Sequence, residues 1–428
     1  MAVTGVRGLM ATVLLVLAGV AGPVGPAQAA PPEQNCVEPG QEAPVDSWAQ
    51  RLLAPQRVWP LTRGENVIVA VLGSGVDAGH PQLRGRVAAG FDATTGTGPA
   101  NTDCLGVGTQ VAGAVGAQAA PPVQVTGVAP QAGIVPVRVV PQGVPAGQIA
   151  VDPAMLARGI DWAVSQHVAV VCVAVVTYTA SPDLQRAVEG ALAQGVVVVS
   201  AVGDRGDPKR YDNPKPYPAA YPGVLAVSAL AATGYRWTNS GYGPFVRIAA
   251  PGAAVPMPQR VKGLVLADNP GVAAGFVAGS VALLLARETT RGNRLTPDAV
   301  LKRVEATATP APHGAPSNDY GSGVVNPYRL VTEGTTDGRP DPLPALQSSP
   351  LSQEARDRAA AWARSEHLAL WLTLAVVVLV VVVIGAGAAL PRGRRRHWRP
   401  GLAPPPRQRS EPAEPGPPVL LFEEPERR

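Results

Sequence analysis

The chain of 428 residues is long enough to bury one large core and still leave segments outside it. Its formal charge of +5 is modest, and its arginines gather near the C-terminus and are not interleaved with aromatic residues along one face. This composition argues against a nucleic-acid partner, and we expect one large domain with appendages.

The N-terminus carries the three parts of a secretory signal peptide. Arg7 precedes an apolar run at residues 9–21, and the sequence Ala-Gln-Ala at residues 27–29 is a small-residue cleavage pattern. We therefore expect a signal peptide at residues 1–29, followed by an N-terminal extension at residues 30–57 of the exported chain.

Short valine-rich runs and helical patterns alternate between residues 58 and 332. The runs are apolar throughout, which is typical of strands buried on both faces of a parallel sheet. They lie at residues 66–72, 168–176, 196–202 and 224–230. Helical patterns lie at residues 153–166 and 182–194, where Pro182 suits a first helical turn and Gly195 a helix end. This alternation predicts an open α/β sheet with right-handed crossovers and helices on both faces.

The composition changes beyond residue 332. Residues 333–367 hold a proline-rich linker and a charged juxtamembrane segment that we expect to be helical. Residues 368–390 are apolar, and at about 1.5 Å per residue they can cross the roughly 30 Å hydrocarbon core of a membrane. The arginines that follow favour one C-terminal transmembrane helix over a buried core helix, with residues 391–428 as a disordered cytoplasmic tail. The domain would then lie outside the cell membrane.

The three cysteines have different surroundings. Cys36 lies in the extension and Cys104 precedes a glycine-containing block, so an oxidising compartment would allow a bridge between them, and the alternative is two unpaired thiols. In the chain-entropy model this bridge would stabilise the fold by about 4 kcal/mol. Cys172 lies in an apolar run and is expected to be a buried thiol without chemistry. The cysteine and histidine spacings suggest no metal, and we expect no other cofactor.

Three blocks of the chain resemble the catalytic blocks of subtilisin-type serine proteases, and each lacks its reactive residue. Gly73 stands at the position of the Asp, Val107 at that of the His and Gly271 at that of the Ser; the blocks are residues 69–76, 106–113 and 270–279. Further segments resemble the same fold in the expected order, at residues 221–229, 239–244, 249–252 and 321–327. The resemblance covers residues 58–330 or so, and it implies a subtilisin-like parallel sheet.

Subtilisin-type catalysis needs a Ser hydroxyl, a His that removes its proton and an Asp that orients the His. Glycine and valine can supply none of these groups, so the resemblance predicts an inactive subtilase. Asp204 stands where the family has the Asn of the oxyanion hole, and an ionised carboxylate repels a developing oxyanion. Bulky apolar side chains at residues 174–176 replace an edge that pairs with substrate. A relocated base would have to come from the remaining histidines at positions 80, 167, 313 and 367, but His80 lies in a turn that is structural in many subtilases.

A narrower resemblance is to the mycosins, membrane-anchored subtilases associated with type VII secretion in actinobacteria. It rests on the signal peptide, the extension with Cys36, residues 103–109, the proline-rich linker and the single C-terminal span. It implies that Cys36 is bridged to the loop before the His block. Mycosins typically have a second cysteine pair within the domain, whereas Cys172 has no partner here.

Our first hypothesis is a pseudoprotease that acts as a structural or docking component of a type VII secretion system and contacts subunits of its membrane complex. The first alternative is a non-cleaving protein that binds an extended peptide in the former substrate cleft. The second is a residual serine endopeptidase with another nucleophile, such as Ser74. Two loops, residues 141–153 and 207–218, are candidates for a docking surface, and the alternative for both is solvated surface. The second loop holds Lys209, Arg210 and Lys215.

Overall fold

The computed structural model describes residues 36–333, apart from residues 44, 143–150, 205–212, 313 and 315. The predicted signal peptide, linker, transmembrane segment and tail lie outside the described residues, as do parts of both candidate loops. Within the described part of the chain one helix, α5 (Pro270–Thr290), is long and apolar enough to cross a membrane. Because 89% of its most apolar stretch is buried inside the domain, α5 is a core helix.

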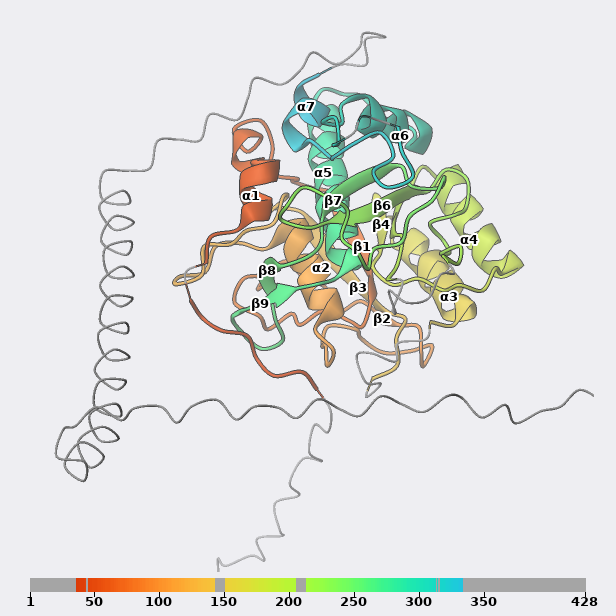
Figure 1. Cartoon of the computed structure of the whole chain (residues 1–428). Coiled ribbons are helices and arrows are strands. Elements are labelled where there is room, and N and C mark those ends of the chain that lie inside the picture. Colours follow the sequence, from red (N-terminus) through yellow and green to blue (C-terminus); the bar gives the residue numbers. More distant parts are fainter. Residues whose placement is uncertain are drawn as a thin grey trace, which may run out of the picture. The chain divides into compact units, whose positions relative to one another are not determined.

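Seven parallel strands form the central sheet, in the spatial order β2-β3-β1-β4-β5-β6-β7 (Figure 1). Four of them are the predicted valine-rich runs: β1 (Ile68–Gly73), β4 (Val170–Val173), β5 (Val197–Ala201) and β6 (Leu225–Leu230). The other three are β2 (Phe91–Asp92), β3 (Gly133–Arg138) and β7 (Ile248–Pro251). The predicted parallel α/β sheet is therefore confirmed, with two edge strands and one inner strand that the valine runs did not indicate.

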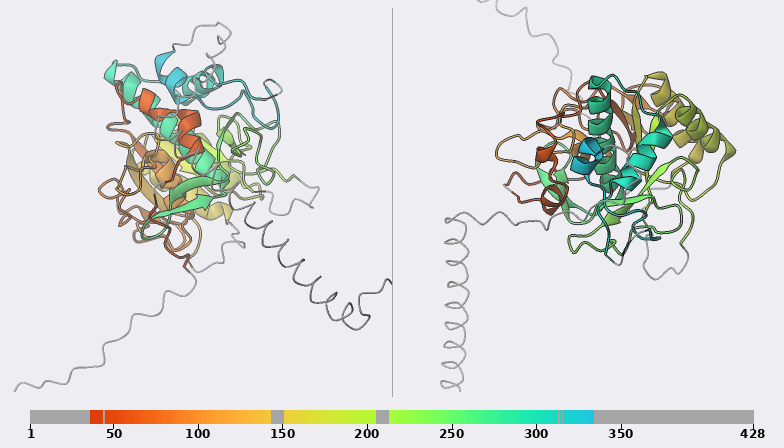
Figure 2. Two further views of the ribbon diagram at one scale, coloured as in Figure 1. Left: turned by 60° about the vertical axis from the view of Figure 1, so that its left-hand side comes forward. Right: turned by 90° about the horizontal axis from the view of Figure 1, so that it is seen from above.

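Helices cover both faces of the sheet, as predicted (Figures 1 and 2). Side chains alternate along a strand, so Val69 and Val71 of β1 point to one face and Ala70 and Leu72 to the other. The first face packs against α2 (Val107–Gly116) and α5, and the second packs against α3 (Pro153–Ser165) and α4 (Pro182–Ala193). The domain thus has a hydrophobic layer on each side of the strands.

Five helices begin with the same local sequence, a capping side chain followed by proline. The cap accepts a backbone N–H of the first turn, and proline fits the first helical position because it has no N–H to satisfy. The pairs are Asp152 and Pro153, Ser181 and Pro182, Asn269 and Pro270, Thr296 and Pro297, and Asn326 and Pro327. The last two pairs open α6 (Pro297–Ala306) and α7 (Pro327–Thr332).

The N-terminal extension is attached to the domain at several points. Cys36 and Cys104 form a disulfide with a Cα–Cα distance of 4.5 Å, which confirms the predicted pairing. Gln41 pairs with Leu264 in the hairpin of β8 (Val255–Pro258) and β9 (Leu264–Ala267). The extension then forms α1 (Trp48–Leu53) and the short 3₁₀ helix η1 (Pro55–Arg57).

Removing the disulfide with Cys36→Ser and Cys104→Ser together is expected to lower the free energy of unfolding. The bridge closes a sequence separation of 68 residues, and chain entropy predicts a loss of about 4 kcal/mol. Urea unfolding of the purified protein measures it. Cys172→Ala is the matched control. Cys172 is a buried free thiol, as predicted, and burial raises its pKa. Its truncation should lower the free energy of unfolding by about 1 kcal/mol. Equal urea midpoints for the double variant and the unmodified protein would contradict the prediction.

His80 is buried and holds the β8–β9 hairpin against the turn that contains it, which confirms its predicted structural place. Its Nε2 lies 3.2 Å from the carbonyl oxygen of Gly263, and its Nδ1 accepts the backbone N–H of Gln82 at 3.2 Å. These two partners together require the neutral ring with its proton on Nε2. Burial lowers the pKa of His80, against the opposing effects of the Gly263 carbonyl and the charges of Asp77 and Glu42.

Acidification is therefore expected to destabilise the domain through His80. The unfolded chain takes up the proton near the ordinary pKa of 6.5, whereas the folded ring takes it up only at lower pH. The contribution of His80 to stability is thus complete above that pH and is lost as the pH falls toward the lowered pKa. Urea midpoints of the unmodified protein and of His80→Gln across this range measure it. If the urea midpoint of His80→Gln falls more steeply with decreasing pH than that of the unmodified protein, the role of His80 is refuted.

Candidate functional site

The carboxyl end of the central strands meets the first turns of two helices at one edge of the sheet. Gly73 is the last residue of β1, Val107 is the first of α2 and Gly271 is the second of α5. Ala174, directly after β4, lies beside both glycines: a Cβ built on Gly73 would lie 3.7 Å from the Ala174 Cβ, and one on Gly271 would lie 3.1 Å from it. In open α/β sheets this edge is where ligands bind. The structure thus brings the three predicted positions to one place.

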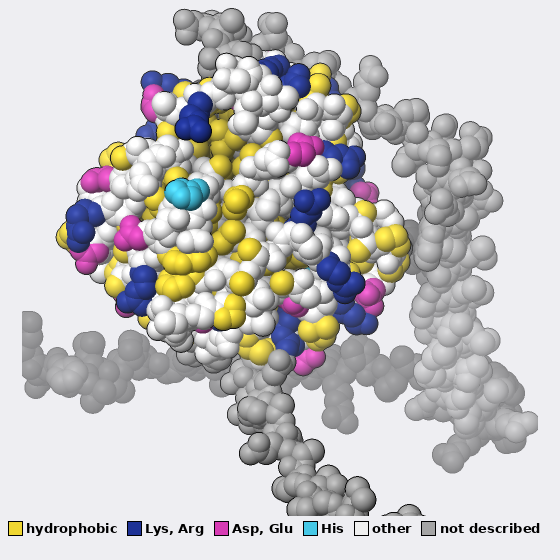
Figure 3. Space-filling view, turned by 180° about the vertical axis from the view of Figure 1, so that it is seen from behind, with side chains coloured by type: hydrophobic (Ala, Val, Ile, Leu, Met, Phe, Trp, Pro, Cys, Tyr) yellow, Lys and Arg dark blue, Asp and Glu magenta, His cyan; other side chains and the backbone are white. Residues whose placement is uncertain are grey.

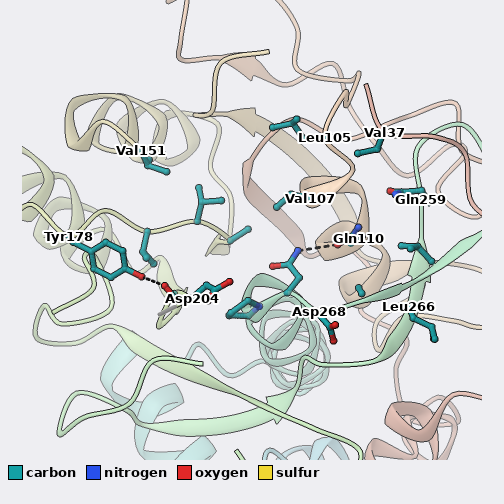
Figure 4. Close-up of a pocket in the computed structure, with 18 residues that line it drawn as sticks. Val37, Leu105, Val107, Gln110, Val151, Tyr178, Asp204, Gln259, Leu266 and Asp268 are labelled. Atoms are coloured by element: carbon teal, nitrogen blue, oxygen red, sulfur yellow. Dashed lines mark hydrogen bonds between the residues drawn. The ribbon is translucent and has the colours of Figure 1, made fainter. Parts of the chain in front are cut away.

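A cavity of about 490 Å³ opens at this edge (Figure 4). Val107, Val175 and Val176 give it apolar walls, and Val37 of the N-terminal extension contributes to its rim. Among the described residues that line it there is no Ser, Thr, Cys, His, Lys or Arg. Its titratable side chains are those of Tyr178, Asp204 and Asp268. Among these described lining residues, then, no Ser, Thr or Cys nucleophile stands beside a His base, the pair that hydrolysis by acyl transfer uses in serine and cysteine proteases.

An amide pair joins the two helices at the cavity. The side-chain nitrogen Nδ2 of Asn269 donates to Oε1 of Gln110 at 3.1 Å, and Figure 4 shows this bond between α5 and α2. Oδ1 of Asn269 accepts the backbone N–H of Gly271 at 2.8 Å and so caps α5. Both ends of the Asn269 amide are therefore used to fix the beginnings of the helices.

The space around Gly271 is closed to a side chain. A Cβ built there would lie 2.8 Å from the carbonyl oxygen of Ala174 and 2.9 Å from Oδ1 of Asn269. Real Cβ atoms do not approach other atoms this closely, and the Ala174 oxygen belongs to the backbone. Gly73 differs, because its nearest neighbour would be Gly108 Cα at 3.5 Å, an ordinary contact. The structure accepts a larger residue at position 73 and resists one at position 271.

Asp204 is exposed and lines the same cavity, directly after Gly203 in the segment that follows β5. Its backbone oxygen accepts the Tyr178 hydroxyl at 2.5 Å, and burial together with the Asp204 charge raises the pKa of Tyr178 to about 12. The side chains of Val176 and Tyr178 occupy the space next to Gly203, where a Cβ would lie 2.5 Å and 2.7 Å from them. This end of the cavity is thus filled by the chain itself.

A buried carboxylate that the sequence analysis did not single out holds this edge together. Asp103 accepts hydrogen bonds from the hydroxyls of Ser74 (2.8 Å) and Thr109 (2.7 Å). It also accepts three backbone N–H groups, from Leu105 (3.0 Å), Gly106 (2.9 Å) and Thr109 (2.9 Å). Burial raises the pKa of Asp103, and the hydrogen bonds from Thr109, Ser74 and Gly106 oppose that effect. Asp103 replaces the missing side-chain cap at Gly106, the residue that precedes α2.

The other residues proposed for chemistry lie away from the cavity. Ser74 is buried and is engaged on both sides, because its hydroxyl donates to Asp103 and accepts the Gly108 N–H at 3.0 Å. His167 follows α3 and precedes β4, so it lies at the opposite, amino edge of the sheet. His313 and His367 lie outside the described residues. Neither described histidine lines the cavity.

A parallel sheet with a cavity between its carboxyl edge and the starts of α2 and α5 defines a subtilisin-like α/β protein. The chain belongs to the subtilase family (peptidase S8), whose family model matches residues 64–323. Subtilisin NAT of Bacillus subtilis subsp. natto is 33% identical over 265 residues, which cover 61% of this chain and 65% of that protein, slightly less than two thirds of its length. Thermitase of Thermoactinomyces vulgaris is 29% identical over 285 residues, covering 66% of this chain and 94% of that protein.

Two similar solved structures are of MycP1. One is described as a serine protease that is an essential component of the type VII (ESX-1) secretion system; it is 26% identical, with a TM-score of 0.60, and the match covers 70% of this chain and 93% of that chain. The other, MycP1 without its N-terminal propeptide, is 27% identical with a TM-score of 0.59, covering 69% of this chain and 99% of that chain. The prediction of a mycosin-like subtilase is therefore confirmed.

Proposed function

We propose that this protein is a catalytically inactive subtilase that serves as a structural or docking component of a type VII secretion system. In this proposal Gly73, Val107 and Gly271 occupy the three catalytic positions, and Asp204 occupies the oxyanion position. The observation that carries the proposal is the closed space at Gly271, because the Ala174 oxygen lies 2.8 Å from where a nucleophile's Cβ would be. The site has therefore lost the room for a serine as well as its hydroxyl.

The scaffold role is supported by what surrounds the site. The fold and its attached N-terminal extension are retained although the cavity lining holds no nucleophile among the described residues. MycP1, which has the same fold, is described as an essential component of a type VII secretion system. A subtilase that contributes contacts to such an assembly can keep that role without catalysis. Residues 1–29 as signal peptide and residues 368–390 as membrane anchor would place the domain outside the cell membrane.

Purification of the native membrane complex through a tag after residue 428 tests this function. Co-purification of type VII secretion subunits, with no fluorophosphonate label on this chain, is the expected result. Label on this chain would overturn the inactivity, and a chain that elutes alone under mild detergent would overturn the structural role. An active subtilisin in the same labelling reaction shows that the reagent works.

The cavity supports a second candidate, a protein that binds an extended peptide without cutting it. Its volume of about 490 Å³ and its apolar walls suit a few peptide side chains. Leu266, whose surface is 63% exposed, lies at its rim and offers an apolar contact. Leu266→Asp should weaken the binding of apolar peptides if this candidate is correct, and it should leave the composition of the purified complex unchanged.

A further inference from the structure

A second concave site, the aromatic pocket, lies between residues 215–222 and 244–247. Its volume is about 350 Å³. Its walls carry the rings of Tyr217, Tyr221 and Phe245 and the exposed prolines Pro222 and Pro244. None of its residues lines the cavity at the carboxyl edge of the sheet. It includes Lys215, which belongs to the loop that the sequence analysis named as a candidate docking surface.

The walls of the aromatic pocket are fixed by hydrogen bonds. The Tyr221 hydroxyl donates to the Ser181 carbonyl at 2.9 Å and accepts the Ser181 N–H at 3.2 Å. Both backbone polar groups of Tyr217 pair with Thr177, at 3.0 Å and 2.8 Å. The rings of Tyr217 and Tyr221 lie 4.8 Å apart between centroids, tilted by 44°. A pocket whose rings are already held in place loses little conformational entropy when a ligand binds.

The charged side chains that line the aromatic pocket are all positive among the described residues. Lys215 and Arg247 are its charged lining residues, and no Asp or Glu is among the described residues that line it. Arg247 has a carboxylate neighbour outside the pocket, Glu305, at 3.5 Å, whereas no described carboxylate lies within ion-pair distance of Lys215. On the face that Figure 3 shows, basic side chains are scattered among acidic and apolar ones. The pocket thus combines apolar rings with two cations, of which Lys215 has no described carboxylate partner and Arg247 has one outside the pocket.

We propose that the aromatic pocket binds an acidic, proline-containing extended segment of a partner protein. Aromatic rings and prolines that line a concave site favour the preformed extended helix of proline-rich segments. Lys215 and Arg247 complement aspartate or glutamate between those prolines, which supplies specificity. The proposal rests on the structural role proposed above, because it names the chemistry of one partner contact.

Short fluorescein-labelled peptides in which prolines alternate with aspartates test the site on the full-length protein in detergent. Fluorescence polarisation should show binding that weakens at least about tenfold with Lys215→Glu, because this change removes one charge-assisted contact and places a carboxylate near the aspartates of the peptide. Pro244→Ser should weaken it as well. Arg84→Glu is the matched control, because it reverses an exposed cation outside the pocket and should change nothing. A peptide with asparagine at every aspartate should bind at least about tenfold more weakly.

Several results would overturn the proposal. Equal affinity for the aspartate and asparagine peptides would show that the charges of the peptide do not contribute to binding. A loss of affinity with Arg84→Glu as large as that with Lys215→Glu would indicate unspecific electrostatic attraction. Loss with Leu266→Asp but not with Lys215→Glu would place the peptide in the other cavity. Binding only after deletion of residues 338–350 would indicate that the chain's own proline-rich linker, and not a partner, takes the pocket. If these peptides fail while secretion subunits still co-purify, the structural role stands and only the assigned pocket is wrong.

Discussion

Introducing a triad at the three proposed catalytic positions, with Gly73→Asp, Val107→His and Gly271→Ser together, is expected to leave the protein without serine-protease activity. A Cβ at position 271 would lie 2.8 Å from the Ala174 oxygen, so the hydroxyl cannot reach its place unless α5 or the end of β4 moves. In subtilisin the triad is worth about a million-fold in turnover, so a correctly built triad would be obvious in a peptide hydrolysis assay. We expect neither hydrolysis above that of the unmodified protein nor fluorophosphonate labelling.

Adding Asp204→Asn to the triple variant is expected to change little, because an oxyanion donor has no effect without a correctly placed nucleophile. Labelling of the serine introduced at position 271 would contradict this expectation. It would show that the backbone adjusts easily and that only side chains had been lost. Subtilisin E in the same assay provides the active reference.

The steric argument can be separated from the chemistry by two alanine substitutions. Alanine in place of glycine within a helix ordinarily stabilises by about 1 kcal/mol, whereas overpacking against fixed backbone destabilises by about 1–3 kcal/mol. Gly271→Ala should therefore lower the urea midpoint. Gly73→Ala, whose new Cβ meets only ordinary contacts, should not lower it. Equal effects at the two positions would remove the basis for a closed nucleophile position.

The sequence indicated the central sheet because its inner strands are apolar on both faces. β4, β5 and β6 are continuous valine- and alanine-rich runs that are buried throughout. β3 was missed because Pro136 interrupts its run, although it pairs in register with β1, with Val71 opposite Pro136. The hairpin of β8 and β9 was missed for a similar reason, since prolines alternate with apolar residues in β8. A pattern of side chains predicts burial, but the pairing partner of a strand is decided by the whole sheet.

The sequence also indicated where the candidate site lies, because the blocks around Gly73, Val107 and Gly271 keep their order and their glycines. It could not indicate that position 271 is closed. That follows from where the backbone of Ala174 lies, and Ala174 is distant in sequence. The aromatic pocket could not be predicted for the same reason, because Lys215 lies in one segment whereas Phe245 and Arg247 come from another. Contacts between distant segments decide the shape of both sites.

Asp103 was visible in the sequence only as part of a resemblance, yet its carboxylate has more partners than any neighbouring side chain at the site. The Asp103 carboxylate accepts five hydrogen bonds, and only 3% of the residue's surface is exposed. The sequence signal that could have identified it is its position three residues before Gly106, where an Asp can cap a helix that lacks its own capping side chain. Its partners extend from the end of β1 to the first turn of α2.

Asp103→Ala is accordingly expected to destabilise the domain strongly, by about 5 kcal/mol, because several buried donors lose their acceptor at once. Urea unfolding followed by tryptophan fluorescence measures the change. Asp152→Ala is the matched control: this exposed carboxylate accepts a single N–H, that of Ala154, at the start of α3, and its loss should cost about 1 kcal/mol.

If Asp103→Ala yields no folded protein, the network can be reduced one bond at a time. Ser74→Ala and Thr109→Val each remove one hydroxyl that donates to the Asp103 carboxylate, and each should cost about 1–2 kcal/mol. The two losses should not add, because both hydroxyls serve the same carboxylate. A cost for Asp103→Ala no larger than that of Asp152→Ala would mean that water replaces the lost acceptor. The beginning of α2, and with it Val107 at the cavity, would then be held by packing and the Cys36–Cys104 bridge alone.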